Sequence, residues 1–355
     1  MLTLFLYLAI LLLSFYLTGV VSDRFFVPSL DEIADRFKLP PDVVGAVFMA
    51  AGSSAPELFV VLFAVLLPGE SENIGVGMIV GSAMVNTLGI IGLSIMARRA
   101  TFTWQPVVRD FLFYGITLLV MLWMFWDGII RPQDAWILLG LYALYLVSMP
   151  LWRKLFPYED RMDILEEIEA ASLEYLSKKK NIVVRVLTYI IPDVIQYPRL
   201  YWATFGMSLL AIAGLSYVLV ESVVEIAQIL SINPTLIALS VVSIGSSIPD
   251  MISSMIVSRK GKSDMIISNA VGSNIFDIAI ALGFPWALYF LLNPGGTIIV
   301  DTENLLVSVL LLFATIVAVL GVLIVRKWTV GFKTGLVLIG CYGVYLGYLI
   351  WMVVG

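Results

Sequence analysis

Two short stretches of the sequence place a carboxylate beside hydroxyls and a proline in otherwise apolar surroundings. GSSAPEL carries Glu57, and GSSIPDM carries Asp250 at the corresponding position. Ser53 and Ser246 each precede the acid by four residues, which puts hydroxyl and carboxylate on one face of a helix. The proline in each stretch has no backbone N–H, so the carbonyl one turn earlier loses its helical partner. Each stretch therefore predicts a cluster of carboxylate, hydroxyl and backbone oxygens.

A second pair of stretches repeats the same four-residue spacing. VGSAMVN contains Ser82 and Asn86, and VGSNIFD contains Ser273 and Asp277. A single serine in a membrane helix more often bonds back to its own helix than to a ligand. The recurrence of the whole set in two parts of the chain favours a ligand role for the serines beside the acids.

Three acids, Glu57, Asp250 and Asp277, fall well inside apolar segments, whereas no lysine or arginine lies in the middle of one. A charge at the centre of a membrane helix costs roughly 2.5–3.5 kcal/mol on insertion scales. Carboxylates without a fixed counter-ion must therefore be protonated or neutralised by something mobile. A ligand set made only of oxygen selects hard cations, of which Ca²⁺ takes about 6–8 oxygens. The residues predict a cation site built from two copies of one motif.

The composition excludes a water-soluble globule. Of the 355 residues, 60% are hydrophobic and 13% are charged, whereas soluble domains carry roughly 45–50% and about 25%. The single cysteine, Cys341, rules out an internal disulfide framework. Because the chain has no histidine, any proton chemistry falls to carboxylates or water. These features indicate an all-α polytopic membrane protein.

Ten segments are long and apolar enough to cross a bilayer, which takes about 20 residues. We expect spanning helices near residues 2–22, 42–67, 73–97, 107–126, 133–152, 201–220, 232–257, 265–292, 303–325 and 334–354.

The placement of basic residues predicts the orientation, because Lys and Arg gather in cytoplasmic loops. With the N-terminus and C-terminus outside, Arg131 is the one basic residue of 21 that remains on the outer side. No basic residue precedes Arg24, so the N-terminal stretch lacks the basic region of a secretory signal, and we interpret it as the first spanning helix. A cleaved signal is the alternative. We expect the protein in the cell membrane.

The two halves of the chain match each other. Residues 1–152 and 201–355 each hold five predicted helices, and residues 153–200 form a cytoplasmic linker. Because five is odd, the second half must be inverted relative to the first. Inverted repeats with interrupted helices indicate a transporter site near the midplane. The paired glycines Gly81 and Gly272 are expected to allow close helix packing. Within the linker, residues 164–180 run from acidic to basic, which suits a surface helix.

At GSSAPEL, GSSIPDM and VGSNIFDI the sequence resembles the cation/calcium exchanger superfamily. DRFFVPSLDEIADRF and SSMIVSRKGKSDMIISNAVGSNIFDIAIALGFPW look most like the branch that couples sodium entry to the export of calcium with potassium. The resemblance covers both halves but not the linker. It implies ten transmembrane helices in two inverted five-helix repeats, in agreement with the count above.

The resemblance also implies a role for each motif residue. Glu57 and Asp250 resemble the central carboxylates that take calcium and sodium in turn. Asp277 is similar to the acid associated with potassium dependence; potassium-independent relatives often have Asn there, although some microbial relatives carry an acid without needing potassium. Backbone oxygens near Ala50 and Ser243 join the site. The surrounding ligands implied by position are Ser53, Ser54, Ser82, Asn86, Ser246, Ser247 and Ser273.

The prediction from sequence is a secondary transporter that exchanges sodium for calcium by alternating access, with potassium carried alongside calcium. A potassium-independent exchanger and a calcium/proton antiporter are the alternatives, and a cation channel and an intramembrane aspartyl protease are more distant ones. We expect no enzymatic activity, no cofactor and no nucleic-acid partner. The expected partners are Ca²⁺, Na⁺, K⁺ and the lipid bilayer, with a monomer as the expected state and a homo-oligomer as the alternative.

Overall fold

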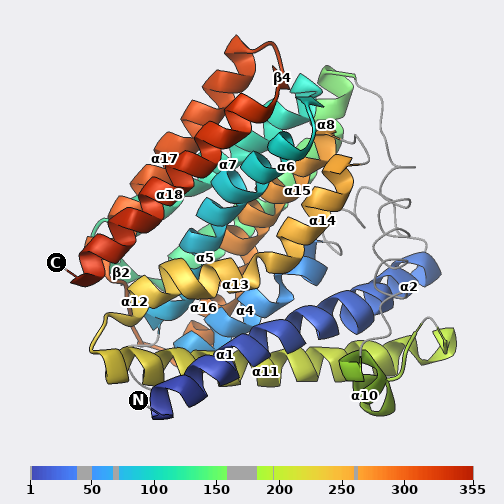
Figure 1. Cartoon of the computed structure of the whole chain (residues 1–355), viewed down its shortest axis with the longest axis vertical. Coiled ribbons are helices and arrows are strands. Elements are labelled where there is room, and N and C mark those ends of the chain that lie inside the picture. The colour runs from blue at the N-terminus through green and yellow to red at the C-terminus, as the bar shows by residue number, and fades with distance from the viewer. Residues whose placement is uncertain are drawn as a thin grey trace.

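The computed structural model describes residues 2–37, 50–66, 72–157, 182–194, 196–259 and 263–354. These residues form a bundle of helices with two very short antiparallel ribbons (Figure 1). The helices of the first half are α1 (Leu2–Val21), α2 (Val27–Phe37), α4 (Ala50–Leu66), α5 (Glu72–Met84), α6 (Ile91–Ala97), α7 (Trp104–Met124) and α8 (Pro132–Leu155).

The second half is also helical and begins after a short helix in the linker, α10 (Ile182–Ile190), and a 3₁₀ turn at Pro198–Leu200. Its helices are α11 (Tyr201–Leu230), α12 (Pro234–Ile237), α13 (Ser243–Ser246), α14 (Ile248–Arg259), α15 (Ser263–Phe276), α16 (Gly283–Leu292), α17 (Thr302–Val325) and α18 (Phe332–Val354).

Short π-helical segments interrupt several of these helices without ending them. They are η1 (Ser22–Phe26), η3 (Val85–Ile90), η5 (Ala238–Val242) and η6 (Asp277–Leu282). Such segments are rare and often mark functional sites. Two of them contain Asn86 and Asp277, the paired residues of the second motif.

Eight helical runs in the described part of the chain are long and apolar enough to cross a membrane, and two shorter apolar helices accompany them, Ala51–Leu66 and Pro234–Ser246. Two expected boundaries are wrong: the first helix continues past residue 22 to Phe37, and the helix expected at 201–220 continues to Leu230. The expected linker helix at 164–180 and the expected span residues 42–49 lie outside the described residues.

The first helix continues because its polar residues face protein rather than lipid. The Ser22 hydroxyl donates a hydrogen bond to the Gly52 carbonyl (2.8 Å). Arg24, expected in a cytoplasmic loop, is buried and forms an ion pair with Asp193. A polar residue is tolerated inside a membrane helix when it finds such partners.

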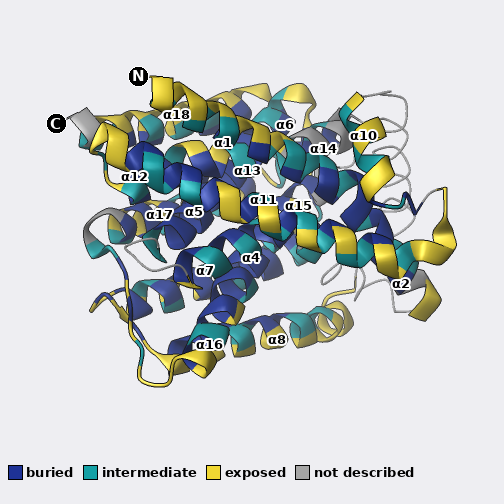
Figure 2. Cartoon of the chain, turned by 90° about the horizontal axis from the view of Figure 1, so that it is seen from below, coloured by how far each residue is buried: buried dark blue, intermediate teal, exposed yellow. Residues whose placement is uncertain are grey.

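The interior of the bundle is formed by the run α5–η3–α6. Every residue from Ile74 to Gly92 is buried, and this run packs against α4, η5 and α18. Figure 2 shows buried residues along the centre of the molecule and exposed residues on the outward faces of the peripheral helices. Since those outward faces carry large apolar side chains such as Leu12, Trp123 and Val344, they suit contact with lipid.

Helices α1 and α11 pack side by side and form a layer against the interior (Figure 1). A separate apolar cluster joins them, with Phe25, Phe26 and Leu30 from the first helical run and Ile212 from α11. Both sides of this layer reach α4: the segment η1, which continues α1, packs on α4, and so does α11.

Two ribbons join the halves of the chain. Strand β1 (Ala100–Thr101) pairs with β4 (Thr329–Val330), and β2 (Ile129–Ile130) pairs with β3 (Ile298–Ile299), both antiparallel. Because β1 precedes α7 and β2 follows it, one ribbon lies at each end of that helix.

The paired glycines Gly81 and Gly272 differ in their surroundings. A Cβ on Gly81 would overlap the Ser243 side chain and the Leu239 carbonyl oxygen, so α5 and the η5–α13 segment approach each other closely there. Among the described residues, a Cβ on Gly272 would meet only the Tyr145 hydroxyl, at 4.0 Å. The expectation of close packing is confirmed for Gly81 and wrong for Gly272.

Substitution of these two glycines by alanine should therefore have different effects. We expect Gly81→Ala to lower the thermal unfolding temperature of the purified protein, because the obstacle includes backbone and overpacking costs about 1–3 kcal/mol. Gly272→Ala, the matched control, should unfold within error of the wild type. Equal unfolding temperatures for Gly81→Ala and the wild type would contradict the close approach.

Candidate functional site

The structure brings the three intramembrane carboxylates of the two motifs together. Glu57 lies in α4, Asp250 in the first turn of α14 and Asp277 at the start of η6. Glu57 interacts electrostatically with both Asp277 and Asp250, and Asp277 also interacts with Asp250. Glu57 and Asp277 are 4% and 2% exposed, whereas Asp250 is partly exposed. The site thus has a buried side and a side nearer to water.

Each carboxylate has a serine hydroxyl as hydrogen-bond partner. The Ser246 hydroxyl donates a hydrogen bond to Glu57, and the Ser54 hydroxyl donates one to Asp277. In both cases the hydroxyl comes from the opposite half of the chain. Asp250 accepts a hydrogen bond from the Ser273 hydroxyl, on α15 of its own half. The hydroxyls compensate part of the negative charge but supply no cation.

Serine pairs also connect the two motifs across the halves. The Ser82 and Ser247 hydroxyls lie 2.9 Å apart, and the Ser54 and Ser273 hydroxyls lie 3.3 Å apart. Each pair joins a first-motif serine of one half to a second-motif serine of the other. All four side chains are buried, so every predicted ligand hydroxyl in these pairs lies in the protein interior.

The two prolines act differently on the backbone. Pro56 lies inside α4 without ending it, and the carbonyl it leaves without a helical partner, that of Gly52, accepts the Ser22 hydroxyl. In the second half the helix is interrupted: α13 ends at Ser246 and α14 begins at Ile248. The expected helix break is therefore present in the second half and replaced by a hydroxyl from η1 in the first.

The predicted backbone ligands lie at the beginnings of helices. Ala50 is the first residue of α4, and Ser243 is the first residue of α13. The Ser243 carbonyl accepts the Ser247 amide (3.1 Å), and the Ser243 hydroxyl lies 3.3 Å from the Met78 carbonyl. Ser53 is partly exposed, as is its counterpart Ser246.

Several buried acceptor oxygens of the site have no hydrogen-bond partner among the described residues: Glu57 Oε2, Asp277 Oδ1 and Asn86 Oδ1. No lysine or arginine of the described chain forms an ion pair with Glu57 or Asp277. Within the same residues, no three acidic side chains gather closely enough around one point to hold a metal ion by themselves. A cation at this site needs hydroxyl, amide or carbonyl oxygens in addition to the carboxylates.

Sequence reasoning missed Asn274, which lies between the predicted residues of VGSNIFD. Its side chain accepts a hydrogen bond from the Asn86 amide (2.9 Å) and donates towards Thr87 (3.2 Å) and Tyr114 (3.1 Å). Asn274 is fully buried, so this network fixes the orientation of Asn86. The sequence signal that could have identified Asn274 is an amide side chain within an apolar helix.

Sequence reasoning also missed Asp23, which it placed outside the spans. The extended first helix carries Asp23 into the bundle, where its carboxylate interacts electrostatically with Asp250. The adjacent Ser22 was expected at the end of the first span and Arg24 in a cytoplasmic loop, and both make buried contacts with other segments.

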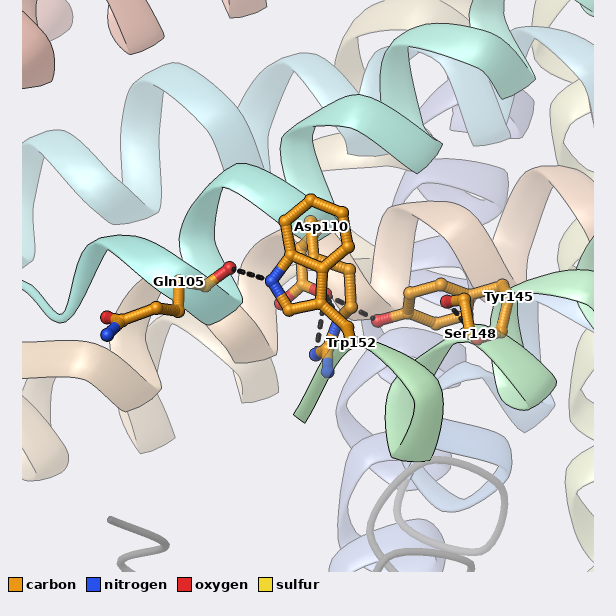
Figure 3. Close-up of polar contacts among 6 residues, drawn as sticks. Gln105, Asp110, Tyr145, Ser148 and Trp152 are labelled. Carbon is orange, nitrogen blue, oxygen red and sulfur yellow. Dashed lines mark hydrogen bonds and ion pairs between the residues drawn. The ribbon is translucent and has the colours of Figure 1, made fainter. Parts of the chain in front are cut away.

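A further buried carboxylate, Asp110 in α7, differs because it has a resident cation. The Arg109 guanidinium donates to it at 2.8 Å and the Tyr145 hydroxyl at 3.1 Å. Figure 3 shows the Tyr145 hydroxyl directed at Asp110, with Trp152 directed at the Gln105 carbonyl nearby. Asp110 and Arg109 are both buried. The Arg109–Asp110 pair lies on α7, and the Tyr145 hydroxyl connects it to α8. The pair leaves no net charge for a mobile ion to neutralise.

Most of the chain matches one protein family. Residues 7–149 and 200–351 match the model of the family described as sodium/calcium exchanger protein.

Curated relatives align with nearly the whole chain. Sodium/potassium/calcium exchanger 1 of Gallus gallus is 25% identical, covering 94% of this chain and 76% of the relative. Sodium/potassium/calcium exchanger 5 of Homo sapiens is 28% identical, covering 96% of this chain and 81% of the relative.

Solved structures share the fold. The H⁺/Ca²⁺ exchanger CAX superposes with a TM-score of 0.69 at 15% identity, over 96% of this chain and 81% of the other. The sodium-calcium exchanger NCX_Mj superposes with a TM-score of 0.55 at 21% identity, over 98% and 99%. These likenesses establish the fold and say nothing of the transported ion.

The Arg109–Asp110 pair gives a prediction about stability. Arg109→Met leaves the Asp110 carboxylate buried without its cation, and removing one partner of a buried pair costs about 3–5 kcal/mol. Arg131→Met is the matched control, since its ion pair with Asp127 is exposed, and such pairs contribute about 0–1 kcal/mol. We expect thermal unfolding in detergent to shift strongly downwards for the first variant only. Similar shifts for both would contradict a resident counter-ion role for Arg109.

Proposed function

The chain belongs to the sodium/calcium exchanger protein family, and on this premise we propose that it exchanges Na⁺ for Ca²⁺ across a membrane, with K⁺ carried alongside Ca²⁺. Its curated relatives are named sodium/potassium/calcium exchangers. The family consists of membrane ion exchangers rather than enzymes, and the apolar helices are those of a multi-pass membrane protein.

One observation carries the proposal: Glu57 and Asp277 are buried, and within the part of the chain that the structure describes each has a carboxylate oxygen without a hydrogen-bond donor. Their neighbours are hydroxyls from both halves of the chain rather than basic side chains. Oxygen ligands of this kind suit Ca²⁺ and alkali ions. The ions are transported substrates, and no resident cofactor is proposed.

The proposed ligands comprise the carboxylates, the hydroxyl and amide oxygens around them, and two backbone positions. They are Glu57, Asp250, Asp277, Ser53, Ser54, Ser82, Asn86, Ser246, Ser247 and Ser273, with backbone oxygens at Ala50 and Ser243. One chain supplies all of them, so a monomer is the proposed transport unit.

The proposed architecture is ten transmembrane helices in two inverted five-helix repeats. The ribbons support it, because exchanging the halves converts one ribbon into the other: β1 corresponds to β3 and β2 to β4, and the observed pairs are β1–β4 and β2–β3. The four serines in the cross-half pairs obey the same exchange. Two related halves that face each other produce this pattern.

The proposed units are residues 1–152, a cytoplasmic linker at 153–200, and residues 201–355. The family match is consistent with this division, since it leaves out residues 150–199. The ribbons also join loops that the basic residues assign to one side: β1 and β4 adjoin Arg98, Arg99 and Arg326, whereas β2 and β3 lie where Arg131 is the one basic residue. This favours termini outside and a location in the cell membrane.

The proposed mechanism is alternating access around a site that Na⁺ and Ca²⁺ share. The same carboxylates hold either ion, so one displaces the other. A charged site without ions is costly to move through a dry barrier, which favours exchange over leak. The α1–α11 layer contacts the first motif through single hydrogen bonds, from Ser22 to Gly52 and from Ser216 to Pro56. Such contacts can break and reform as the layer moves.

Removal of the Glu57 charge should abolish exchange. In vesicles loaded with Na⁺, we expect tracer Ca²⁺ uptake by Glu57→Gln below about a tenth of the wild-type rate, since one lost contact of about 1.5–3 kcal/mol is worth at least tenfold. Glu225→Gln, on the partly exposed face of α11, is the matched control and should retain uptake. Wild-type uptake that ignores the Na⁺ gradient and follows a pH gradient would instead identify a calcium/proton antiporter.

Substitution of Asp277 should change the response to K⁺. The wild type is expected to take up Ca²⁺ faster with K⁺ than with a large inert cation, and Asp277→Asn should reduce that difference because a carboxylate ligand becomes a neutral amide. The measurement is Na⁺-driven Ca²⁺ uptake with the two external cations compared. An unchanged K⁺ response in Asp277→Asn would remove Asp277 from potassium binding.

A further inference from the structure

The carboxylate of Asp23 faces the proposed site although it belongs to neither repeated motif. Asp23 lies in η1, directly after Ser22, whose hydroxyl bonds the Gly52 carbonyl at 2.8 Å. This contact holds η1 against the beginning of the GSSAPEL stretch. Val27, four residues further on, packs so closely that a Cβ on Gly52 would meet it at 2.8 Å. The position of Asp23 is therefore fixed by contacts on both sides of it.

The charge of Asp23 is not neutralised by its surroundings. Among the described residues, Asp23 has no hydrogen-bond or ion-pair partner, and its one electrostatic interaction is with a like charge, Asp250. The neighbouring Arg24 does not serve it, since the guanidinium is paired with Asp193. A carboxylate that faces a like charge, as Asp23 faces Asp250, is stabilised when a cation binds it.

Independent evidence for a ligand comes from Glu57, on the other side of Asp250. Its Oε2 atom is buried and finds no hydrogen-bond partner in the described segments, and its carboxylate interacts with Asp250. Asp250 thus has two carboxylate neighbours that carry no basic partner among the described residues, Glu57 and Asp23. Asp23 and Asp250 are both partly exposed, whereas Glu57 is 4% exposed.

We propose that Asp23 is a fourth cation-binding carboxylate, which with Asp250 receives cations at the partly exposed edge of the site and passes them to Glu57 and Asp277. The assignment rests on the proposed exchange function and extends it to a residue of the first helix. The assignment also accounts for η1. Because the helical run continues through Ser22, Asp23 and Arg24, the Asp23 carboxylate reaches the site, while the Arg24 guanidinium is paired with Asp193.

The first test is the dependence of Na⁺-driven uptake on Ca²⁺ concentration, in vesicles reconstituted with the full chain. We expect Asp23→Asn to raise the half-saturating Ca²⁺ concentration about tenfold, as for the loss of one charged contact, with the maximal rate largely kept. Asp23→Glu should restore most of the affinity. Glu32→Gln is the matched control, because Glu32 lies on the same helical run but pairs with Arg36 at the surface.

The second test separates ligand binding from structure. Ca²⁺ that binds the folded state raises the unfolding temperature of the purified protein, and we expect this rise to be smaller in Asp23→Asn. Without Ca²⁺, the variant should unfold no earlier than the wild type, because the substitution removes a repulsion. A purely structural role predicts the opposite, an earlier unfolding without Ca²⁺ and an unchanged rise with it.

The outcomes distinguish this inference from the proposed function. Wild-type vesicles that show no Na⁺-driven Ca²⁺ uptake would overturn the proposed function, while the Ca²⁺-dependent unfolding of wild type and Asp23→Asn would still decide the role of Asp23. Active wild-type protein with an Asp23→Asn variant of unchanged affinity and unchanged Ca²⁺ stabilisation would overturn the inference alone.

Discussion

The cost of burying negative charge without a positive partner governs this structure. A carboxylate moved out of water is stable only if it is protonated, paired or bound to a metal ion. The chain contains buried carboxylates of two kinds, one paired with a basic side chain and the others without such a pair among the described residues. Asp110 is buried against Arg109, a resident cation on its own helix. Glu57 and Asp277 are buried among hydroxyls, and the residues around them leave carboxylate oxygens without donors. The Asp110 charge is neutralised within the protein, and for Glu57 and Asp277 we propose neutralisation by a mobile cation.

The packing around the motifs holds these carboxylates in place without neutralising them. Serines of one half meet serines of the other in two equivalent pairs, and the Asn86–Asn274 contact adds a buried amide bridge. The close approach at Gly81 brings α5 against the segment that leads into the second motif. The two halves therefore share one polar interior, to which each contributes hydroxyls and carboxylates.

The sequence predicted the helices, the two motifs and their meeting in space, because apolar length and repeated oxygen-bearing residues are local signals. It placed Asp23 and Arg24 in a loop, because polar residues follow the apolar segment that ends near Ser22. The residues that Ser22, Asp23 and Arg24 meet in space, Gly52, Asp250 and Asp193, are distant in the sequence, so no local pattern could reveal that the helix continues. The expectation of close packing at Gly272 was wrong for a related reason. Two positions related by a repeat share their neighbours in sequence but not their neighbours in space.

The most direct test of the central claim is a crystal structure of the protein grown with Sr²⁺ in place of Ca²⁺, in which the heavier ion is located by its anomalous scattering. If mobile cations neutralise these acids, a strong anomalous peak will lie within coordination distance of Glu57 and Asp250. It will disappear in Glu57→Gln crystals soaked under the same conditions. A wild-type structure at saturating Sr²⁺ with no peak among the carboxylates would contradict the account.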